Sequence, residues 1–179
     1  MLTNYYRFIT ISYMIRKVKE SDIKPISDIY NYYIENTTFT FEQTSLSLNE
    51  MEARIKKISE SFPYLVREDE GEVTGYAYAN TWKERSSYNK TVEISIYLKN
   101  GTQGKGRGKE LLKSLLDELY NNQFHLLIAG IVQPNDVSVK TFEHFGFRKV
   151  GQFTEVGFKM NKWLDVGYWE LLLNKKSQN

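Results

Sequence analysis

The 179-residue chain contains no cysteine, only two histidines and only three prolines. The missing cysteine excludes disulfide scaffolds, thiolate zinc sites and enzymes that use a cysteine nucleophile. Two histidines are too few for a His-rich catalytic metal centre, so we expect no metal. With so little proline and no internal repeat, collagen-like and linker-like classes are excluded as well.

The chain also lacks long apolar runs and any large excess of charge of one sign. No apolar run approaches the ~20 residues that span a bilayer, and the first residues lack the basic segment and apolar stretch of an export signal. Together with the missing cysteine, these features predict a cytoplasmic protein. Lys and Arg number 24 and Asp and Glu 22, and the formal charge of +2 provides no general attraction to nucleic acid or to an anionic membrane.

What is present is the composition of one folded domain. Hydrophobic residues make up 41% of the chain and aromatic residues 15%, which is too much for a disordered protein, and the length suits a single core. We expect residues 14–174 to form this domain and residues 175–179 to form a polar tail. Residues 1–13 are expected to be an extension, either an added edge strand or a translated upstream segment.

The hydrophobic pattern predicts a mixed α/β fold with one central sheet, in the order βααβββαβαββ. Helices are expected over residues 21–36, 47–61, 108–121 and 134–145. Strands are expected over residues 15–18, 64–67, 73–81, 91–98, 126–131, 148–156 and 168–173. Ser21 is the expected N-cap of the first helix and Asn135 that of the fourth. Ser47 and Glu50 form a capping box on the second helix.

A glycine-rich and basic segment, QGKGRGK, lies between the strand expected over 91–98 and the helix that follows it. Its glycines let backbone N–H groups approach a ligand closely, and the helix start adds unpaired N–H donors with partial positive charge. This predicts an anion site suited to a pyrophosphate, while a flexible basic loop without a ligand is the alternative. The residues concerned are Gln103, Gly104, Lys105, Gly106, Arg107, Gly108 and Lys109.

The spacing of this loop decides between the known phosphate motifs. Glu110 follows Lys109 where a Walker loop needs Ser or Thr, and the G-x-G-x-x-G spacing of dinucleotide sites is also absent. The pattern that fits is Q-x-x-G-x-G, and residues 135–147 carry a second pattern, N-x-x-S-x-x-x-aromatic-x-x-x-G-F. In both patterns the sequence resembles the GNAT superfamily of acetyl-CoA-dependent N-acetyltransferases.

The resemblance covers residues 15 to about 173. It implies the GNAT acyl-CoA N-acyltransferase fold, in which a mostly antiparallel sheet is flanked by helices, and it implies acetyl-CoA as co-substrate. In this family the loop amides take the pyrophosphate of coenzyme A, and the preceding strand pairs with its pantetheine arm. For His144, which the resemblance places near the coenzyme, a solvated helix position without a role in binding is an equal alternative. The implied coenzyme-binding residues are Ile96, Tyr97, Leu98, Gln103, Gly104, Lys105, Gly106, Arg107, Gly108, Lys109, Asn135 and His144.

Three separate segments resemble a narrower branch, the phosphinothricin N-acetyltransferases. They are TTFTFE at residues 37–42, YNKTVEISIY at 88–97 and EVGFKMNKWLD at 155–165. This implies direct acetylation of the amine of a small amino acid or analogue, such as phosphinothricin, methionine sulfoximine or methionine sulfone. Two alternatives stay open: a protein or peptide N-terminal acetyltransferase, and a coenzyme A-binding module that has lost catalysis.

Glu93 is a charged residue inside the otherwise apolar strand TVEISIYL. An amine attacks a thioester only as the free base, so a carboxylate beside the acceptor can serve by removing its proton. A carboxylate inside a central strand is costly unless it is paired or functional, and pairing with a nearby Lys or Arg is the structural alternative. The branch resemblance implies a catalytic and substrate-contacting Glu at this position.

Two positions depart from the pattern of the family. Ile94 stands where related sequences often carry His directly after the catalytic Glu, so an imidazole relay is absent. Phe142 stands where many members carry the Tyr that acts as acid for the departing thiolate. The sequence therefore leaves the proton relay and the general acid open.

The resemblance implies acceptor contacts on several segments. Lys159 is expected to pair with a substrate carboxylate, against the alternative of an ordinary surface lysine, and residues 86–88 fit a polar surface loop as well. The branch is usually dimeric, and we expect a homodimer whose interface uses aromatic residues near the C-terminus, unless these are buried within one chain. The aromatics are Trp163, Tyr168 and Trp169. The expected substrate-binding residues are Phe41, Ser86, Ser87, Tyr88, Glu93 and Lys159.

Overall fold

The structure is a computed structural model that describes residues 13–122 and 124–173. The expected polar tail and the expected N-terminal extension, apart from Tyr13, lie outside the described residues. Tyr13 and Met14 belong to the first strand, so the boundary expected after residue 13 falls inside that strand. The guanidinium carbon of Arg67 lies 3.9 Å from the centre of the Tyr13 ring, which ties the start of the strand to the sheet.

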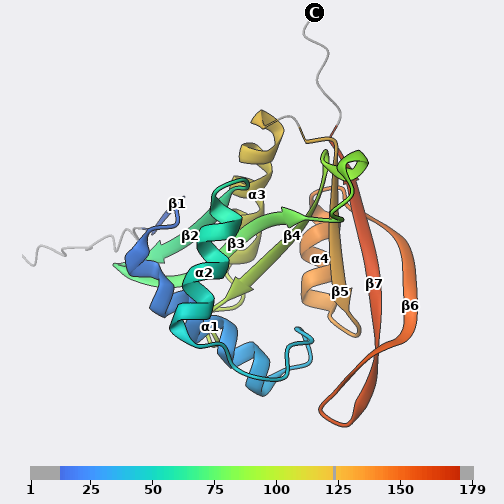
Figure 1. Cartoon of the computed structure of the whole chain (residues 1–179), viewed down its shortest axis with the longest axis horizontal. Coiled ribbons are helices and arrows are strands. Elements are labelled where there is room, and N and C mark those ends of the chain that lie inside the picture. Colours follow the sequence, from blue (N-terminus) through green and yellow to red (C-terminus); the bar gives the residue numbers. More distant parts are fainter. Residues whose placement is uncertain (1–12, 123, 174–179) are drawn as a thin grey trace, which may run out of the picture.

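Seven strands of the described residues form one sheet in the order β1-β2-β3-β4-β5-β7-β6 (Figure 1). Neighbouring strands are antiparallel except β4 and β5, which run parallel. The expected element order and the mostly antiparallel sheet are thereby confirmed. The strands are β1 (Tyr13–Lys17), β2 (Tyr64–Asp69), β3 (Glu72–Thr81), β4 (Thr91–Leu98), β5 (Leu126–Val132), β6 (Arg148–Lys159) and β7 (Lys162–Leu172).

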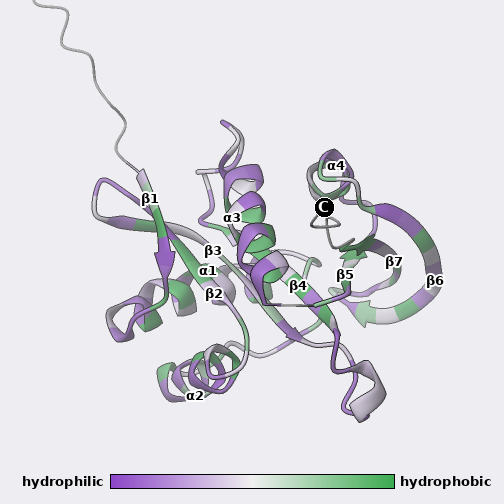
Figure 2. Cartoon of the chain, turned by 90° about the horizontal axis from the view of Figure 1, so that it is seen from above, coloured by the Kyte–Doolittle hydropathy of each residue, from purple (hydrophilic) through white to green (hydrophobic). Residues whose placement is uncertain are grey.

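Helices cover both faces of this sheet. In Figure 2, α1 and α2 lie on one side of β2 and β3, and α3 lies on the other. No helix among the described residues is long and apolar enough to cross a membrane. The helices are α1 (Ile23–Asn36), α2 (Leu48–Ser59), α3 (Arg107–Asn121) and α4 (Asp136–His144).

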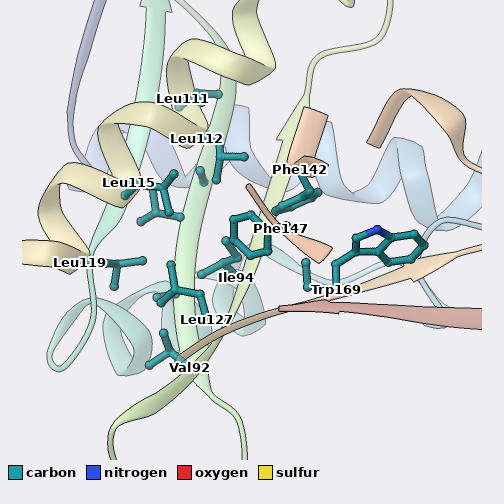
Figure 3. Packing of buried hydrophobic residues seen from close by; sticks show 14 of the residues in the cluster. Val92, Ile94, Leu111, Leu112, Leu115, Leu119, Leu127, Phe142, Phe147 and Trp169 are labelled. Atoms are coloured by element: carbon teal, nitrogen blue, oxygen red, sulfur yellow. The ribbon is translucent and has the colours of Figure 1, made fainter. Parts of the chain in front are cut away.

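The larger core lies between the sheet and α3 with α4 (Figure 3). Leucines repeat along α3 at intervals of three and four residues, and this helix packs on β2, β3 and β4, with the leucine stripe buried as the periodicity predicts. Trp169 belongs to this core: it is 2% exposed, and its Nε1 donates to Glu143 at 3.0 Å. The expectation that Trp169 serves a dimer interface is therefore wrong, because the ring is buried within one chain.

Two of the three expected helix caps are confirmed. Glu50 N donates to Ser47 Oγ at 3.3 Å, and Ser47 N donates to Glu50 Oε2 at 2.8 Å, which completes the capping box. Asn135 caps α4, because its Oδ1 accepts from Ser138 N at 3.2 Å.

The third expected cap, Ser21, is wrong. Ser21 lies within a short 3₁₀ helix, η1 (Glu20–Asp22), and α1 begins only after Asp22. The Asp22 carboxylate accepts from Lys19 N and from Arg16 Nη2, both at 2.9 Å. The Asp22 carboxylate thus accepts from the backbone N–H of Lys19, which would otherwise lack an acceptor in the turn. Asp is as well suited as Ser to this capping role.

The last hairpin is longer than the sequence predicts. β6 continues to Lys159 and β7 begins at Lys162, through a region expected to be a loop. The two residues between them, Met160 and Asn161, have φ of 51° and 60°, as a two-residue hairpin turn requires. Neither residue is glycine, so the turn carries only a weak sequence signal. β6 is also exposed along almost its whole length, which removes the hydrophobic alternation of a half-buried strand.

Candidate active site

The parallel strands β4 and β5 stay paired for only three residues each. Thr91 to Glu93 pair with Leu126 to Ile128, and beyond Glu93 the two strands no longer pair. A cleft of about 400 Å³ lies where they separate. A strand edge that is unpaired beside a cleft can hold an extended ligand through its backbone N–H and C=O groups.

Half of the residues expected to bind the coenzyme line this cleft. The other walls come from Gly130 to Val132 of β5, from the first turns of α4, and from Thr37 and Phe39 after α1. Phe142 also contributes, so the position where many family members have a hydroxyl group presents an apolar ring. The expected coenzyme residues in the lining are Ile96, Tyr97, Leu98, Gln103, Gly108 and Asn135.

The loop before α3 has the geometry of an anion site. Gly104, Lys105 and Gly106 have φ of 83°, 51° and 79°, so three consecutive residues turn the backbone sharply. Gly106 is the N-cap of α3, and no side chain caps this helix end. Among the described residues, the N–H groups of Gly108 and Lys109 have no acceptor. Free N–H donors at the positive end of a helix suit a phosphate group.

Arg107 lies in this loop but directs its side chain to the sheet. Its Nε donates to Asp69 Oδ2 at 2.9 Å and its Nη1 donates to Thr102 O at 2.9 Å. Arg67 and Thr74 donate to the same carboxylate, at 3.2 and 2.8 Å. Burial alone would raise the pKa of Asp69, but these hydrogen bonds hold it below its ordinary value. The Arg107 side chain thus positions the loop, and the exposed Lys105 and Lys109 are left as its cations.

Glu93 lies at the point where β4 and β5 separate. The side chain is half-buried, and among the described residues it has no hydrogen-bond or ion-pair partner. Burial raises the pKa of this carboxyl group, and the charge of Lys83 opposes the rise. An unpaired carboxylate with a raised pKa fits a general base better than the alternative of a structural ion pair.

Tyr168 lies near Glu93, with Trp82 and Phe153 packed on its ring, and none of the three was predicted as part of the acceptor site. A Cβ atom on Gly130 would lie 3.2 Å from Glu93 Oε1 and 3.3 Å from Tyr168 Cε1, so carboxylate and phenol ring meet over that glycine. The Tyr168 ring centre lies 5.7 Å from that of Trp82 and 5.6 Å from that of Phe153. Gly130 of β5 pairs with Tyr168 of β7, and this pairing brings the Tyr168 ring to Glu93. The sequence of one strand does not show which residues of the next strand it pairs with, so this contact could not be predicted.

The other half of the expected coenzyme residues and all of the expected acceptor residues, Glu93 included, lie outside the lining of the cleft. Ser86, Ser87 and Tyr88 form an exposed 3₁₀ helix, η2, in the connection between β3 and β4 (Figure 1). His144 is the exposed last residue of α4, at the opposite end of the helix from Asn135. Their roles in binding stay predictions.

Lys159 is not a surface lysine. It is 4% exposed, and its Nζ donates to Thr40 O at 2.8 Å. Burial lowers the pKa of this amine, and the charge of Glu42 opposes the fall. Phe41 lies beside the same hairpin, with its ring against Gly157. The Lys159 ammonium group therefore already has a backbone partner, which argues against its predicted pairing with a substrate carboxylate.

Within residues 13–122 and 124–173, no group of three or more His, Cys, Asp or Glu side chains is placed to hold a metal ion. Around the cleft, the described residues present a carboxylate, free backbone N–H groups and a helix start suited to an anion.

The family model of the GNAT acetyltransferase domain matches residues 15–167. The chain belongs to the GNAT acetyltransferase family. The phosphinothricin N-acetyltransferase of Streptomyces coelicolor is 34% identical over 165 residues, covering 90% of this chain and 96% of that protein. The L-methionine sulfoximine/L-methionine sulfone acetyltransferase of Salmonella typhimurium is 32% identical over 162 residues, which cover 90% of this chain and 95% of that protein.

A solved GNAT structure agrees with these relatives. The GNAT superfamily phosphinothricin acetyltransferase of Sinorhizobium meliloti, crystallised in complex with AcCoA, has a TM-score of 0.89 and 33% identity to this chain. The match covers 94% of this chain and 92% of that one. The predicted GNAT fold, the acetyltransferase class and the resemblance to the phosphinothricin and methionine sulfoximine branch are thus confirmed.

Proposed function

We propose that this GNAT enzyme transfers the acetyl group of acetyl-CoA to the amine of a small amino acid or amino-acid analogue. The observation that carries the proposal is the unpaired Glu93 carboxylate, which lies where β4 and β5 separate and beside Gly130 of the cleft wall. The relatives support the acceptor class, since they are named for phosphinothricin, methionine sulfoximine and methionine sulfone.

Acetyl-CoA would lie in the cleft with its pyrophosphate at the start of α3 and its thioester toward Glu93. The free N–H groups of Gly108 and Lys109, with the exposed Lys105, would hold the pyrophosphate at the start of α3. The edge of β4 from Ile96 to Leu98 would hold the pantetheine arm, with Asn135 on the opposite wall. This arrangement brings the thioester toward the point where the strands separate, next to Glu93.

Catalysis would be a direct transfer. The acceptor amine attacks the thioester carbonyl carbon, a C–N bond forms, the C–S bond breaks, and coenzyme A leaves as the thiolate. Glu93 takes the proton that the amine gives up, directly or through water. Backbone N–H groups of β4 near Tyr97 and Leu98 would stabilise the negative charge on the carbonyl oxygen. The chain has no cysteine, so no acetyl-cysteine intermediate precedes this step.

Lys83 is the cation that we assign to the acceptor's carboxylate. Its charge acts on Glu93, so it lies on the acceptor side of the cleft, and its Nζ stands 4.8 Å from the centre of the Trp82 ring. Lys159, which the sequence suggested for this role, is bonded to the backbone instead. Trp82 and Tyr168 would form the apolar wall beside the acceptor side chain.

We further propose a homodimer in the cytoplasm, without nucleic-acid or membrane partners. The cysteine-free composition and the formal charge of +2 support the location and the absence of such partners. Exposed apolar side chains gather on the β6–β7 hairpin, a long edge that a second copy would cover. They are Val150, Phe153, Val156, Phe158, Met160, Trp163 and Leu172.

A thiol-release screen tests the proposed function. The purified protein is given acetyl-CoA and, in turn, methionine sulfone, methionine sulfoximine, phosphinothricin, each ordinary amino acid and a set of short peptides. We expect release with at least one free amino acid or analogue and acetyl-CoA binding by calorimetry. Binding without release for any amine, or release with peptides alone, contradicts the proposal.

A further inference from the structure

The connection between α1 and α2 forms part of the wall of the cleft. Thr37 and Phe39 line the cleft, and the chain then passes through Thr40, Phe41 and Glu42. We call residues 37–42 the acceptor loop. This loop and the β6–β7 hairpin are far apart in the sequence, yet two contacts join them.

The first contact is the bond from Lys159 to the acceptor loop. Lys159 lies at the end of β6, and its buried Nζ donates to Thr40 O at 2.8 Å. A buried ammonium group is costly unless it is well paired, and a methionine of similar length would avoid that cost. The loop supplies what offsets this cost: the hydrogen bond to Thr40 O and the charge of Glu42, which favours the ammonium form of Lys159.

The second contact is between Phe41 and Gly157. A Cβ atom on Gly157 would lie 2.4 Å from Phe41 Cε1 and 2.5 Å from Cζ, closer than real Cβ contacts. The ring therefore occupies the space that any other residue at position 157 would need. The β6–β7 register is irregular between Phe153 and Gly157, with Glu155 at a φ of 50°, and this irregularity precedes the contact with the loop.

The helical side holds the same loop. The Tyr30 hydroxyl group lies 3.0 Å from Thr40 Oγ1 and donates to Glu42 Oε1 at 3.1 Å. Arg54 of α2 donates to the same Glu42 oxygen at 2.6 Å. The loop is thus fixed at Thr40 from both sides, by α1 on one and by the hairpin on the other.

We propose that Gly157 and Lys159 are positioning residues, which anchor the acceptor loop to the β6–β7 hairpin and thereby place Phe39 against the acceptor. The proposal rests on the proposed function for the identity of the acceptor site. The coenzyme site at the start of α3 does not include either contact. The anchor should therefore affect acceptor binding and leave acetyl-CoA binding unchanged.

Gly157→Ala tests the anchor, and Gly151→Ala is its matched control. Both glycines lie in β6, but a Cβ atom on Gly151 meets no atom within 4 Å. We expect Gly157→Ala to raise the acceptor KM by about tenfold or more with a smaller change in kcat, because the loop is displaced. The acetyl-CoA Kd should stay within about twofold of wild type, as in Gly151→Ala.

Two further variants separate an anchor from a folding defect. Phe41→Ala removes the ring that the new Cβ meets, so Gly157→Ala combined with Phe41→Ala should be no worse than Phe41→Ala alone. Lys159→Met keeps the length of the side chain without its charge, and it should raise the acceptor KM as Gly157→Ala does. A double variant that shows the sum of both defects contradicts the contact.

Hydrogen–deuterium exchange of residues 37–42 gives a readout without any acceptor. We expect faster exchange in Gly157→Ala and Lys159→Met, and wild-type exchange in Gly151→Ala. Unchanged exchange together with an unchanged acceptor KM overturns the proposal. If wild type acetylates no amine, the proposed function fails, while the exchange data still decide whether the hairpin anchors the loop.

Discussion

Glu93 and Tyr168 meet over Gly130, where a Cβ atom would lie 3.2 Å from the carboxylate oxygen and 3.3 Å from the ring. The two side chains come from strands on either side of β5, and the missing side chain at position 130 lets them approach. Half-burial beside an aromatic ring explains why the pKa of Glu93 is raised. The proton acceptor of the proposed reaction thus depends on a glycine in the neighbouring strand.

Gly130→Ala should impair this arrangement without unfolding the protein. The added Cβ is tight on both sides, so Glu93 or Tyr168 has to shift by a few tenths of an ångström. We expect kcat with a saturating acceptor to fall by about tenfold, since a 1 Å displacement of a reacting group costs about 10²-fold. Steady-state kinetics measure the effect, with Gly151→Ala as control. Full kcat in a folded Gly130→Ala protein argues against a role for this geometry.

Gly108→Ala should weaken acetyl-CoA binding and spare the fold. Its Cβ would lie 3.7 Å from Leu98 Cδ1, an ordinary contact, and alanine is a better helix former than glycine. We expect an unchanged or higher Tm but an acetyl-CoA Kd about tenfold weaker, because the methyl group enters the space of the pyrophosphate. Lys113→Ala, on the exposed face of α3, is the control. An unchanged Kd in calorimetry places the phosphate elsewhere.

Asp69→Asn should destabilise the protein and loosen the phosphate loop. Removing one charge from the buried group of Asp69, Arg67 and Arg107 costs about 3–5 kcal/mol of unfolding free energy at neutral pH. Because the pKa of Asp69 is lowered on folding, its contribution is present above its unfolded value of 3.8 and is lost as pH falls through the folded value. Denaturant titrations should therefore show a difference from wild type that shrinks at acidic pH. Asp28→Asn, at an exposed ion pair, should change stability by less than about 1 kcal/mol.

Trp163→Lys should separate the proposed homodimer. Trp163 is 61% exposed on the β6–β7 hairpin, and a charge there opposes burial against a second copy. Light scattering at micromolar concentration should give a dimer mass for wild type and a monomer mass for the variant. Tyr120→Lys, at an exposed position on α3, should leave the dimer intact. A monomeric wild type refutes the proposed assembly.

The sequence predicts the elements of this fold well where burial imposes a period. The leucine stripe of α3 and the capping box at Ser47 and Glu50 are local signals, and both are confirmed. The β6–β7 turn has no glycine, and β6 before it lacks an alternation of buried and exposed residues, so its sequence did not indicate a hairpin. A hydrophobic period appears in the sequence only where one face of an element is buried, so it does not identify an edge strand that is exposed on both faces.

Only part of the candidate site can be predicted from local sequence patterns. Glu93 is found because a charge interrupts an apolar strand, and the phosphate loop is found because its glycines recur at a fixed spacing. Tyr168 and the contact of Lys159 with Thr40 depend on which strands and loops become neighbours. A single sequence contains no direct record of such long-range pairings.

The most direct test of the account is the pH dependence of kcat for wild type and Glu93→Gln at saturating acceptor. Glutamine keeps the shape of the side chain and removes its basicity, so kcat at pH 7 should fall by about 10²–10⁴-fold, while the acetyl-CoA Kd should hardly change. The deficit should shrink as pH rises, because more acceptor then arrives already deprotonated, and the acidic limb of wild-type activity should lie above the ordinary Glu value of 4.5. Glu170→Gln, which removes a carboxylate ion-paired with Arg148 on the same sheet, should keep wild-type kinetics. A Glu93→Gln enzyme with near-normal kcat at pH 7 would contradict the account, because the carboxylate would then be structural.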